Sequence, residues 1–261
     1  MHDAWESGDP YEYFMGRWSR MVAESFVEWL SPSPGLKWLD VGCGTGALSE
    51  VIINRRAPAE LIAIDQSEKF ISTARDRLGD SARCRVGNAL ALSVESGSID
   101  VCVSGLVLNF IPAPLDALAE MRRVTTAGGM VAVYVWDYAG TMGFLNHFWD
   151  TADRLNPEVS GLHEGHRFPD TNAAGLGGLF EQAGFDDIGL NPIEIPTHFV
   201  SFDDYWKPFL GGQGPAGTYV RSLNESDRAS LGKALRESLP IAPDGSISLA
   251  ARAWAVKGIV T

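Results

Sequence analysis

The sequence predicts an α/β fold, in which helices cover both faces of a mostly parallel sheet, and two observations carry this prediction. Apolar, β-rich runs alternate with helical patterns over residues 37–136, which is typical of parallel strands joined by helices. The runs IDVCVSGLVL and MVAVYVW are nearly continuous in apolar residues, as strands buried on both faces require. With 261 residues the chain is long enough for one large domain, which we expect to span residues 1–261.

An amphipathic helix is expected before the first strand, over residues 11–30. Its apolar residues recur at spacings of three and four, and the cluster of Pro32, Pro34 and Gly35 ends the pattern. Strands and helices then alternate through residues 36–136. The expected strands are 37–42, 61–65, 83–87, 100–105 and 130–136, and the expected helices are 46–55, 68–78 and 115–124.

The pattern changes after residue 136. Segments 137–184 and 201–240 are interpreted as insertions that build the wall of a substrate pocket, although extra packing helices explain them equally well. From residue 163 on we expect a polar loop at HEGHRFPD, a strand at 186–199, a helix at SFDDYWKPFL, a loop at GGQGPAG, a helix at 224–238 and a last strand at 246–258.

The charge balance excludes several classes of partner. A net charge of −12 argues against binding to a nucleic-acid backbone or to an anionic membrane, so the expected partner is a small molecule. No apolar run approaches the roughly 18 residues of a membrane helix, and the first residues lack a signal-peptide pattern. Cys43, Cys84 and Cys102 show no metal-type spacing, which favours a reduced, cytoplasmic setting and no metal site. The oligomeric state is left open.

The stretch WLDVGCGTGALS, at the end of the first expected strand, is the strongest local motif. Gly42, Gly44 and Ala47 satisfy the dinucleotide pattern G-x-G-x-x-G/A, and Asp65 follows about 20 residues later. The glycines let the backbone approach a ligand closely, and the next helix offers free N–H groups to a carboxylate. The glycines alone therefore do not identify the ligand.

Asp40 favours a ligand with a cationic amine over a ligand with a pyrophosphate. Its carboxylate would place like charge beside a pyrophosphate, whereas it suits a ligand with a cationic amine. An amino-acid zwitterion joined to a nucleoside fits both the carboxylate and the helix N-terminus, and S-adenosylmethionine is such a molecule. An NAD-dependent oxidoreductase remains the alternative at this point.

With these residues, the sequence resembles the class I S-adenosylmethionine-dependent methyltransferases, especially the small-molecule branch of the ubiquinone and menaquinone biosynthesis type. Asp40-Val41-Gly42-Cys43-Gly44-Thr45-Gly46 is similar to the first motif of the family, and Ile64-Asp65-Gln66 to the second. Gly87-Asn88-Ala89 is similar to the third, commonly G-D-A, and residues 99–104 to the fourth strand. The resemblance implies a Rossmann-like, seven-stranded sheet whose last strand runs antiparallel beside its neighbour.

The resemblance also implies roles for individual residues. Asp65 would accept hydrogen bonds from both ribose hydroxyls, Gln66 would pack on the adenine, and Asn88 would replace the acid that accepts from the adenine amino group. Residues 11–30 would form a helix that covers the cofactor as a lid. The implied cofactor-binding set is Arg17, Trp18, Asp40, Gly42, Gly44, Gly46, Asp65, Gln66, Asn88, Ala89 and Leu106.

The expected chemistry is transfer of a methyl group to a small organic acceptor of aromatic or apolar character. The reaction is an in-line displacement, so positioning supplies much of the catalysis, and the sequence singles out no catalytic residue. If the acceptor must lose a proton, the candidate bases are Asp137, Tyr138, His147, Glu164 and Tyr205. The candidate substrate-lining residues are Asn109, Trp136, Tyr138, His147 and Trp206. The aromatic residues can also be interpreted as a second core, and this interpretation stays open. The whole chain can also be interpreted as a non-catalytic module that binds the cofactor.

Overall fold

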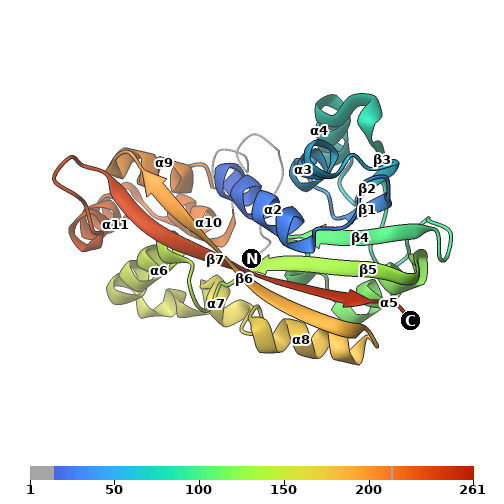
Figure 1. The fold of residues 1–261 in the computed structure, drawn as a ribbon. Coiled ribbons are helices and arrows are strands. Elements are labelled where there is room, and N and C mark those ends of the chain that lie inside the picture. Colours follow the sequence, from blue (N-terminus) through green and yellow to red (C-terminus); the bar gives the residue numbers. More distant parts are fainter. Residues whose placement is uncertain (1–14, 213) are drawn as a thin grey trace. The chain divides into compact units, whose positions relative to one another are not determined.

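The computed structural model describes residues 15–212 and 214–261, which form a seven-stranded sheet with flanking helices (Figure 1). The strands are β1 (Lys37–Val41), β2 (Glu60–Asp65), β3 (Arg83–Val86), β4 (Ile99–Gly105), β5 (Thr125–Trp136), β6 (Asp186–Phe199) and β7 (Ile247–Ile259). The helices are α2 (Arg17–Leu30), α3 (Ala47–Arg56), α4 (Glu68–Leu78), α5 (Pro114–Val124), α6 (Gly143–Leu155), α7 (Glu164–Arg167), α8 (Ala173–Gln182), α9 (Phe202–Leu210), α10 (Gly214–Ser222) and α11 (Glu225–Ser238), with the 3₁₀ helices η2 (Gly79–Ser81), η3 (Leu108–Phe110) and η4 (Pro157–Leu162).

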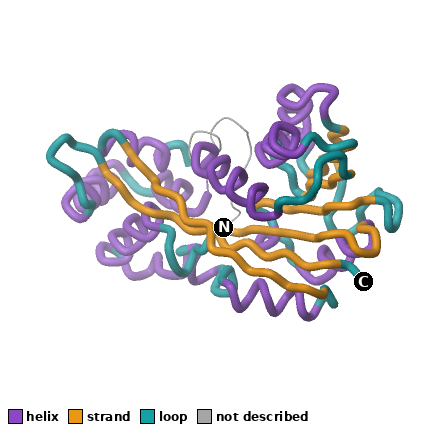
Figure 2. The backbone as a smooth tube through the Cα atoms, viewed as in Figure 1, coloured by secondary structure: helices purple, strands orange, loops and turns teal. Residues whose placement is uncertain are grey.

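The order of strands in the sheet is β3-β2-β1-β4-β5-β7-β6 (Figure 2). Strands β1 to β5 pair in parallel, and β7 pairs antiparallel with β5. The predicted fold class and the predicted antiparallel last strand are therefore confirmed. The direction of winding reverses between β1 and β4, and open α/β sheets bind ligands outside the carboxyl ends of the strands at such a switch point.

The chain divides into two compact units. The sheet unit comprises residues Ser19–Trp136, Asp170–Ile193 and Ala253–Thr261, and the aromatic unit comprises residues 15–18, Asp137–Pro169, 194–212 and 214–252. Helix α8 belongs to the sheet unit, so the expected insertion 137–184 coincides with the aromatic unit only in part. The expectation of one domain over the whole chain, and of a substrate-side role for both insertions, stays a prediction.

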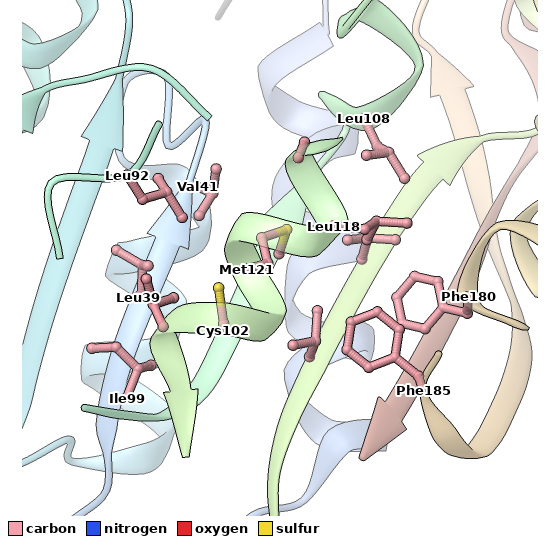
Figure 3. Packing of buried hydrophobic residues seen from close by; sticks show 14 of the residues in the cluster. Leu39, Val41, Leu92, Ile99, Cys102, Leu108, Leu118, Met121, Phe180 and Phe185 are labelled. Carbon is pink, nitrogen blue, oxygen red and sulfur yellow. The ribbon is translucent and has the colours of Figure 1, made fainter. Parts of the chain in front are cut away.

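The core of the sheet unit lies between the strands, α5 and α8. Leu39 and Cys102 from the sheet pack with Met121 of α5 and Phe180 of α8 (Figure 3). Successive side chains of a strand point to opposite faces of the sheet. Leu39 therefore points into this cluster, whereas its neighbours Trp38 and Asp40 point to the other face. Near-continuous apolar strands are therefore needed to fill both faces.

The opposite face of the sheet is covered by α2, α3 and α4. Phe26 of α2 lies 4.6 Å from Tyr134 of β5, measured between ring centroids, and Ile71 of α4 packs with Ala63 of β2. Asp40 of β1 is the exception on this face, since it is a buried carboxylate among apolar residues.

The aromatic unit has its own core. Phe148 of α6 stacks on Phe209 of α9 with a centroid distance of 4.6 Å, and the Tyr205 hydroxyl donates to the carbonyl of Phe144 at 2.8 Å. Five aromatic side chains of this unit are almost fully buried: Phe144, Phe148, Trp149, Tyr205 and Phe209. Their packing supports the second-core interpretation for most of the aromatic residues that follow residue 136.

Strand β6 is the last strand of the sheet at its β7 edge. Gly189 lies beside Lys257, and the His198 ring nitrogen lies 3.2 Å from the Ser248 hydroxyl, so β6 and β7 run antiparallel. Pro192 and Pro196 both lie within β6, four residues apart. Proline is tolerated at sheet edges because it has no N–H to donate.

Two local expectations need correction. Helix α10 begins at Gly214, inside the expected loop GGQGPAG, because Pro215 suits the first turn of a helix and Gly217 packs directly on the backbone of Gly212. The expected polar surface loop HEGHRFPD contains the short helix α7, whose Glu164 is buried. The helix expected over residues 11–30 is present as α2 (Arg17–Leu30), and residues 11–14 of that expectation lie outside the described residues.

No helix in the described part of the chain has the length and apolar character needed to cross a membrane.

Two leucines on α5 give a matched test of the sheet-unit core. Leu118 is fully buried, whereas Leu115 is 39% exposed. Leu118→Ala is expected to lower the free energy of unfolding by about 2–5 kcal/mol because it leaves a cavity, and Leu115→Ala by less than about 1 kcal/mol. Urea unfolding of the two variants measures the difference, and equal midpoints would contradict the described packing.

Candidate functional site

The loop after β1 turns back over strand β2. Gly42 N donates to the carbonyl of Ile64 at 2.7 Å. Gly42, Gly44 and Gly46 all have positive φ, at 74°, 54° and 86°, a conformation that L side chains rarely adopt. We call residues 42–46 the glycine loop. It lies at the carboxyl end of β1, beside the switch point of the sheet.

Close packing leaves no room for a side chain at Gly42 and little room at Gly46, independently of their φ. A Cβ on Gly42 would lie 2.7 Å from Cγ1 of Val107, and a Cβ on Gly46 would lie 3.0 Å from Cδ1 of Leu78. A Cβ on Gly44 would meet nothing within 4 Å. No sequence pattern indicated the contact with Val107, which joins the glycine loop to the turn after β4.

Asp65 ends β2 and connects the glycine loop to the start of α4. Its Oδ2 accepts from Gly44 N at 3.0 Å, and its Oδ1 accepts from Ser67 N at 2.8 Å. Burial raises the pKa of Asp65, while backbone hydrogen bonds from Ser67, Gly44 and Gln66 lower it. A carboxylate oxygen has more than one lone pair, so Asp65 can accept further hydrogen bonds from ligand hydroxyls.

Asp40 lies on β1 with no exposed surface. The Ser49 hydroxyl of α3 donates to its Oδ2 at 2.7 Å, and its Oδ1 has no partner among the described residues. Burial raises the pKa of Asp40 to about 7; the nearby Asp65 adds to this rise, and the Ser49 hydroxyl opposes it. Because Asp40 has no exposed surface, it can act on a bound cation by long-range electrostatic attraction. Its direct contact with a ligand amine stays a prediction.

Ser49 was not expected as part of the site. It stands in the first turns of α3, where its neighbours Leu48 and Val51 are buried. A polar residue at a buried helical position, nine residues after a buried acid, is the only sequence signal that could have pointed to it.

The three cysteines do not supply a nucleophile. Burial raises the pKa of Cys43 and of Cys102, and the carboxylate of Asp40 raises both further. Burial also raises the pKa of Cys84. Because the thiolate is the reactive form, these side chains stay protonated and inert at neutral pH.

The turn after β4 is strained. Leu106, which was expected to contact the cofactor, has a φ of 62°, and this conformation costs about 1–2 kcal/mol for a residue with a Cβ. Its N–H donates to the carbonyl of Tyr134 at 2.8 Å. Asn109, an expected substrate-lining residue, follows in η3, and neither polar atom of its amide has a partner among the described residues.

The expected adenine-side residues lie after β2 and β3. The Oδ1 atom of Asn88 accepts from Leu90 N at 2.9 Å, and an amide oxygen can accept a second hydrogen bond. Ala89 packs partly against the core, and Gln66 is exposed. These three residues follow neighbouring strands of the sheet unit, and their roles toward a ligand stay predictions.

Arg17 and Trp18 belong to the aromatic unit, where they have partners of their own. The Arg17 Nη1 atom lies 3.2 Å from the Asp204 carboxylate, and the guanidinium lies over the rings of Trp18 and Phe199. Trp18 packs edge-on against Phe199 with a centroid distance of 5.5 Å. The charge of Arg17 is thus engaged by Asp204, and the expected cofactor-binding roles of Arg17 and Trp18 stay predictions.

The other expected substrate-lining residues fall on both units. Trp136 ends β5 in the sheet unit and is 2% exposed. In the aromatic unit, Tyr138 is buried beside Phe168, Trp206 stacks on Phe202, and His147 is partly buried on α6. Their packing gives each aromatic ring a structural role.

Three of the candidate bases are engaged within the aromatic unit. Asp137 lies 3.5 Å from the Arg252 guanidinium and accepts from Thr141 N. Glu164 accepts a hydrogen bond from the Trp149 indole. Burial raises the pKa of Tyr205 well above its ordinary value, which disfavours it as a base. In the described part of the chain, no group of three His, Cys, Asp or Glu side chains is placed to hold a metal ion.

Comparison with known sequences agrees with this geometry. Residues 39–133 match the family described as "Methyltransferase domain". The chain resembles the class I S-adenosylmethionine-dependent methyltransferases. The match begins in β1 and ends in β5, so it contains the glycine loop, Asp65 and the turn after β4. The resemblance expected from the motifs is thus confirmed.

Individual relatives extend this comparison. The ubiquinone/menaquinone biosynthesis C-methyltransferase UbiE of Cereibacter sphaeroides is 33% identical over 119 residues, which cover 44% of this chain and 48% of that protein. The malonyl-[acyl-carrier protein] O-methyltransferase of Erwinia pyrifoliae is 37% identical over 140 residues, which cover 53% of this chain and 51% of that protein. The chain therefore spans about half the length of these curated relatives.

A solved structure shows that the methyltransferase likeness extends to the fold. Haemonchus contortus phosphoethanolamine N-methyltransferase 2, in complex with S-adenosyl-L-methionine, superposes with a TM-score of 0.58 at 15% sequence identity. The superposition covers 96% of this chain and 56% of that chain.

The glycine loop gives a matched pair of variants. Gly42→Ala is expected to destabilise the protein by more than about 2 kcal/mol, because it adds a contact with Val107 to the strain of a positive φ. Gly44→Ala adds only the strain, about 1–2 kcal/mol. Thermal unfolding compares them, and adding Val107→Ala should recover part of the loss for Gly42→Ala alone. Equal losses in both variants would contradict the contact with Val107.

The buried Asp40 predicts a pH dependence of stability. Its pKa is raised from 3.8 to about 7 in the folded protein, so folding binds a proton between these pH values and the cost of burying the charge grows as pH rises. At pH 8 this cost is about 4 kcal/mol. The stability of Asp40→Asn relative to the unmodified protein is therefore expected to increase from pH 4.5 to pH 8.

Urea unfolding at pH 4.5, 6 and 8 measures this trend. Asp76→Asn, an exposed position on α4, is the control and should show a flat difference. A flat difference for Asp40→Asn as well would show that Asp40 is not buried as described.

Proposed function

We propose that the chain transfers a methyl group from S-adenosylmethionine to a small organic acceptor, and that the glycine loop and Asp65 hold the cofactor. The observation that carries this proposal is the geometry of Asp65. One carboxylate fixes Gly44 N of the glycine loop and Ser67 N of α4, and it retains lone pairs at the carboxyl end of β2. These lone pairs suit the two hydroxyls of a ribose.

The charge of the site supports a cationic cofactor. Asp40 and Asp65 place two carboxylates near the glycine loop, and the proximity of Asp65 raises the pKa of Asp40. A cationic sulfonium or ammonium group would relieve this repulsion, whereas a pyrophosphate would increase it. The orphaned Oδ1 of Asp40 fits the same conclusion, because a nearby positive charge stabilises an unpaired carboxylate.

The residues of this chain would act by binding and orienting. The cofactor would supply a methyl group that is already activated, and the protein would hold the acceptor in line with it. The backbone of the glycine loop can approach the amino-acid part of the cofactor because no Cβ intervenes. Three of the five candidate bases, Asp137, Glu164 and Tyr205, are engaged elsewhere, and the proposal assigns no base to this reaction.

A small organic acceptor is supported by two lines of observation. The net charge of −12 disfavours nucleic acid as a substrate. One of the relatives is a C-methyltransferase of ubiquinone/menaquinone biosynthesis, and another is a malonyl-[acyl-carrier protein] O-methyltransferase. We infer for this chain an acceptor of aromatic or apolar character with a carbon or oxygen nucleophile.

Titration calorimetry with S-adenosylhomocysteine and, separately, with NADH tests the cofactor. Micromolar binding of the first alone supports the proposal, and binding of NADH alone would replace it by the oxidoreductase alternative. Binding without transfer of a deuterated methyl group to any member of a broad acceptor panel, followed by mass spectrometry, would favour the non-catalytic alternative.

Asp65→Asn should weaken S-adenosylhomocysteine binding about 10- to 100-fold, because the charge of the carboxylate is lost and one of its two acceptor oxygens is replaced by an NH2 group that cannot accept. Asp76→Asn lies on exposed helix surface and should bind normally. Calorimetry on both variants measures the effect, with circular dichroism to show that each is folded. Unchanged affinity in Asp65→Asn would remove this residue from its assigned role.

A further inference from the structure

The imidazole of His163 holds the start of the short helix α7 in the aromatic unit. Its Nδ1 atom accepts a hydrogen bond from Gly165 N at 2.8 Å. The carbonyl of His163 accepts from His166 N and from Arg167 N. The ring is closely packed, because a Cβ on Gly165 would lie 3.0 Å from its Cε1 atom. One residue therefore caps the helix with both its side chain and its main chain.

The hydrogen bond from Gly165 N fixes the protonation state of this ring. A backbone N–H can only donate, so the Nδ1 atom of His163 must offer a lone pair, and the proton of the neutral ring lies on Nε2. A histidine cation carries a proton on both nitrogens and accepts no hydrogen bond. The charged form of His163 is therefore incompatible with the cap.

The neighbouring His166 is bonded in the opposite sense. Its Nδ1 atom lies 2.7 Å from the carbonyl oxygen of Ser160. A carbonyl can only accept, so Nδ1 of His166 is the donor, and a second proton on Nε2 leaves this hydrogen bond intact. Acid thus breaks the side-chain hydrogen bond of His163 and preserves that of His166.

The charged groups around His163 act in both directions. Burial lowers the pKa of His163, and a positive charge on His166 lowers it further, whereas Asp150 and Asp153 of α6 oppose this change. The rings of the two histidines lie 5.1 Å apart, measured between centroids. Arg167 of the same helix lies over the ring of the next residue, 5.2 Å from its centroid. The neutral ring is therefore the form that suits the folded turn.

The cap of α7 is connected to the interior of the aromatic unit. Glu164, the first residue of α7, is buried and accepts a hydrogen bond from the indole of Trp149. The Trp149 ring lies 6.0 Å from the His163 ring, measured between centroids. Gly165 is also buried, so loss of the cap leaves its N–H shielded from water and without an acceptor. The turn can satisfy this N–H by opening to solvent.

We propose that residues 163–167 form an acid-sensitive latch, in which protonation of His163 breaks the hydrogen bond from Gly165 N and releases the turn from the indole of Trp149. This inference is independent of the proposed function, because the residues that carry it lie in the aromatic unit. Below the ordinary histidine pKa of 6.5, the open latch binds a proton that the closed latch excludes. The open form is therefore favoured as pH falls, and the closed form is favoured above this pH.

Amide hydrogen exchange of residues 163–168 measures the opening of the latch. After division by the intrinsic exchange rate at each pH, exchange in the unmodified protein should be faster at pH 5.0 than at pH 7.5 by up to about 30-fold, a limit that follows from a pKa of 6.5 in the open form. An increase of less than threefold would overturn the proposal. An equal loss of protection in β4 and β5 would also overturn it, because the whole protein would then be unfolding.

His163→Asn and His166→Asn form a matched pair of variants. An asparagine side chain at the start of the helix accepts from the backbone but takes no proton, so His163→Asn should keep the latch closed at both pH values. His166→Asn should still open in acid, because His163 is unchanged. An unaltered acid response in His163→Asn, or loss of the response in His166→Asn, would overturn the proposal.

Nitrogen NMR of the histidine rings in the unmodified protein tests the latch without any variant. After resonance assignment at pH 7.5, His163 should show an unprotonated Nδ1 and a proton on Nε2. A proton on Nδ1 of His163 would show that Gly165 N does not donate to this ring, and it would overturn the proposal even if neither variant folds.

Discussion

The carboxylate of Asp65 is the interaction on which the candidate site depends. One oxygen holds Gly44 N and the other holds Ser67 N, so a single side chain fixes the glycine loop relative to the start of α4. The start of the loop is held separately, since Gly42 N and Cys43 N both donate to the carbonyl of Ile64. Once the loop is fixed, Gly42 lies against Val107, and the turn after β4 is fixed in the same step.

The least favourable feature of the candidate site is the buried carboxylate of Asp40. Asp40 has one hydrogen bond from Ser49 and none to its second oxygen from the described residues. A chain selected for stability alone would place an apolar residue there. Its retention agrees with the general rule that sites store unfavourable interactions which a ligand relieves.

The motifs and the alternation of strands and helices were sufficient to predict most of the sheet unit. Strand and helix periods are local properties, and near-continuous apolar runs specify strands with two buried faces. The same local reasoning failed at GGQGPAG, because glycine indicates both flexible turns and close packing, and Gly217 serves packing against Gly212. It also failed for Glu164, whose burial depends on the distant indole of Trp149.

The candidate site was predictable only where a motif fixes the backbone. Gly42, Gly44, Gly46 and Asp65 were found because their spacing reflects the path of the chain. Pairing between residues far apart in sequence leaves no such trace: the partner of Arg17 is Asp204, 187 residues away. For the same reason, aromatic residues such as Phe148 and Tyr205 read equally well as pocket lining or as core.

The two prolines of β6 have a consequence for how the chain meets other chains. An outer strand with a full set of amide hydrogens can recruit an identical strand and extend the sheet from one molecule into the next. Pro192 and Pro196 remove two of these hydrogens, four residues apart, from a 14-residue strand. A strand of another molecule that paired with β6 would lack hydrogen bonds at these prolines. The prolines therefore disfavour extension of the sheet from one molecule to the next.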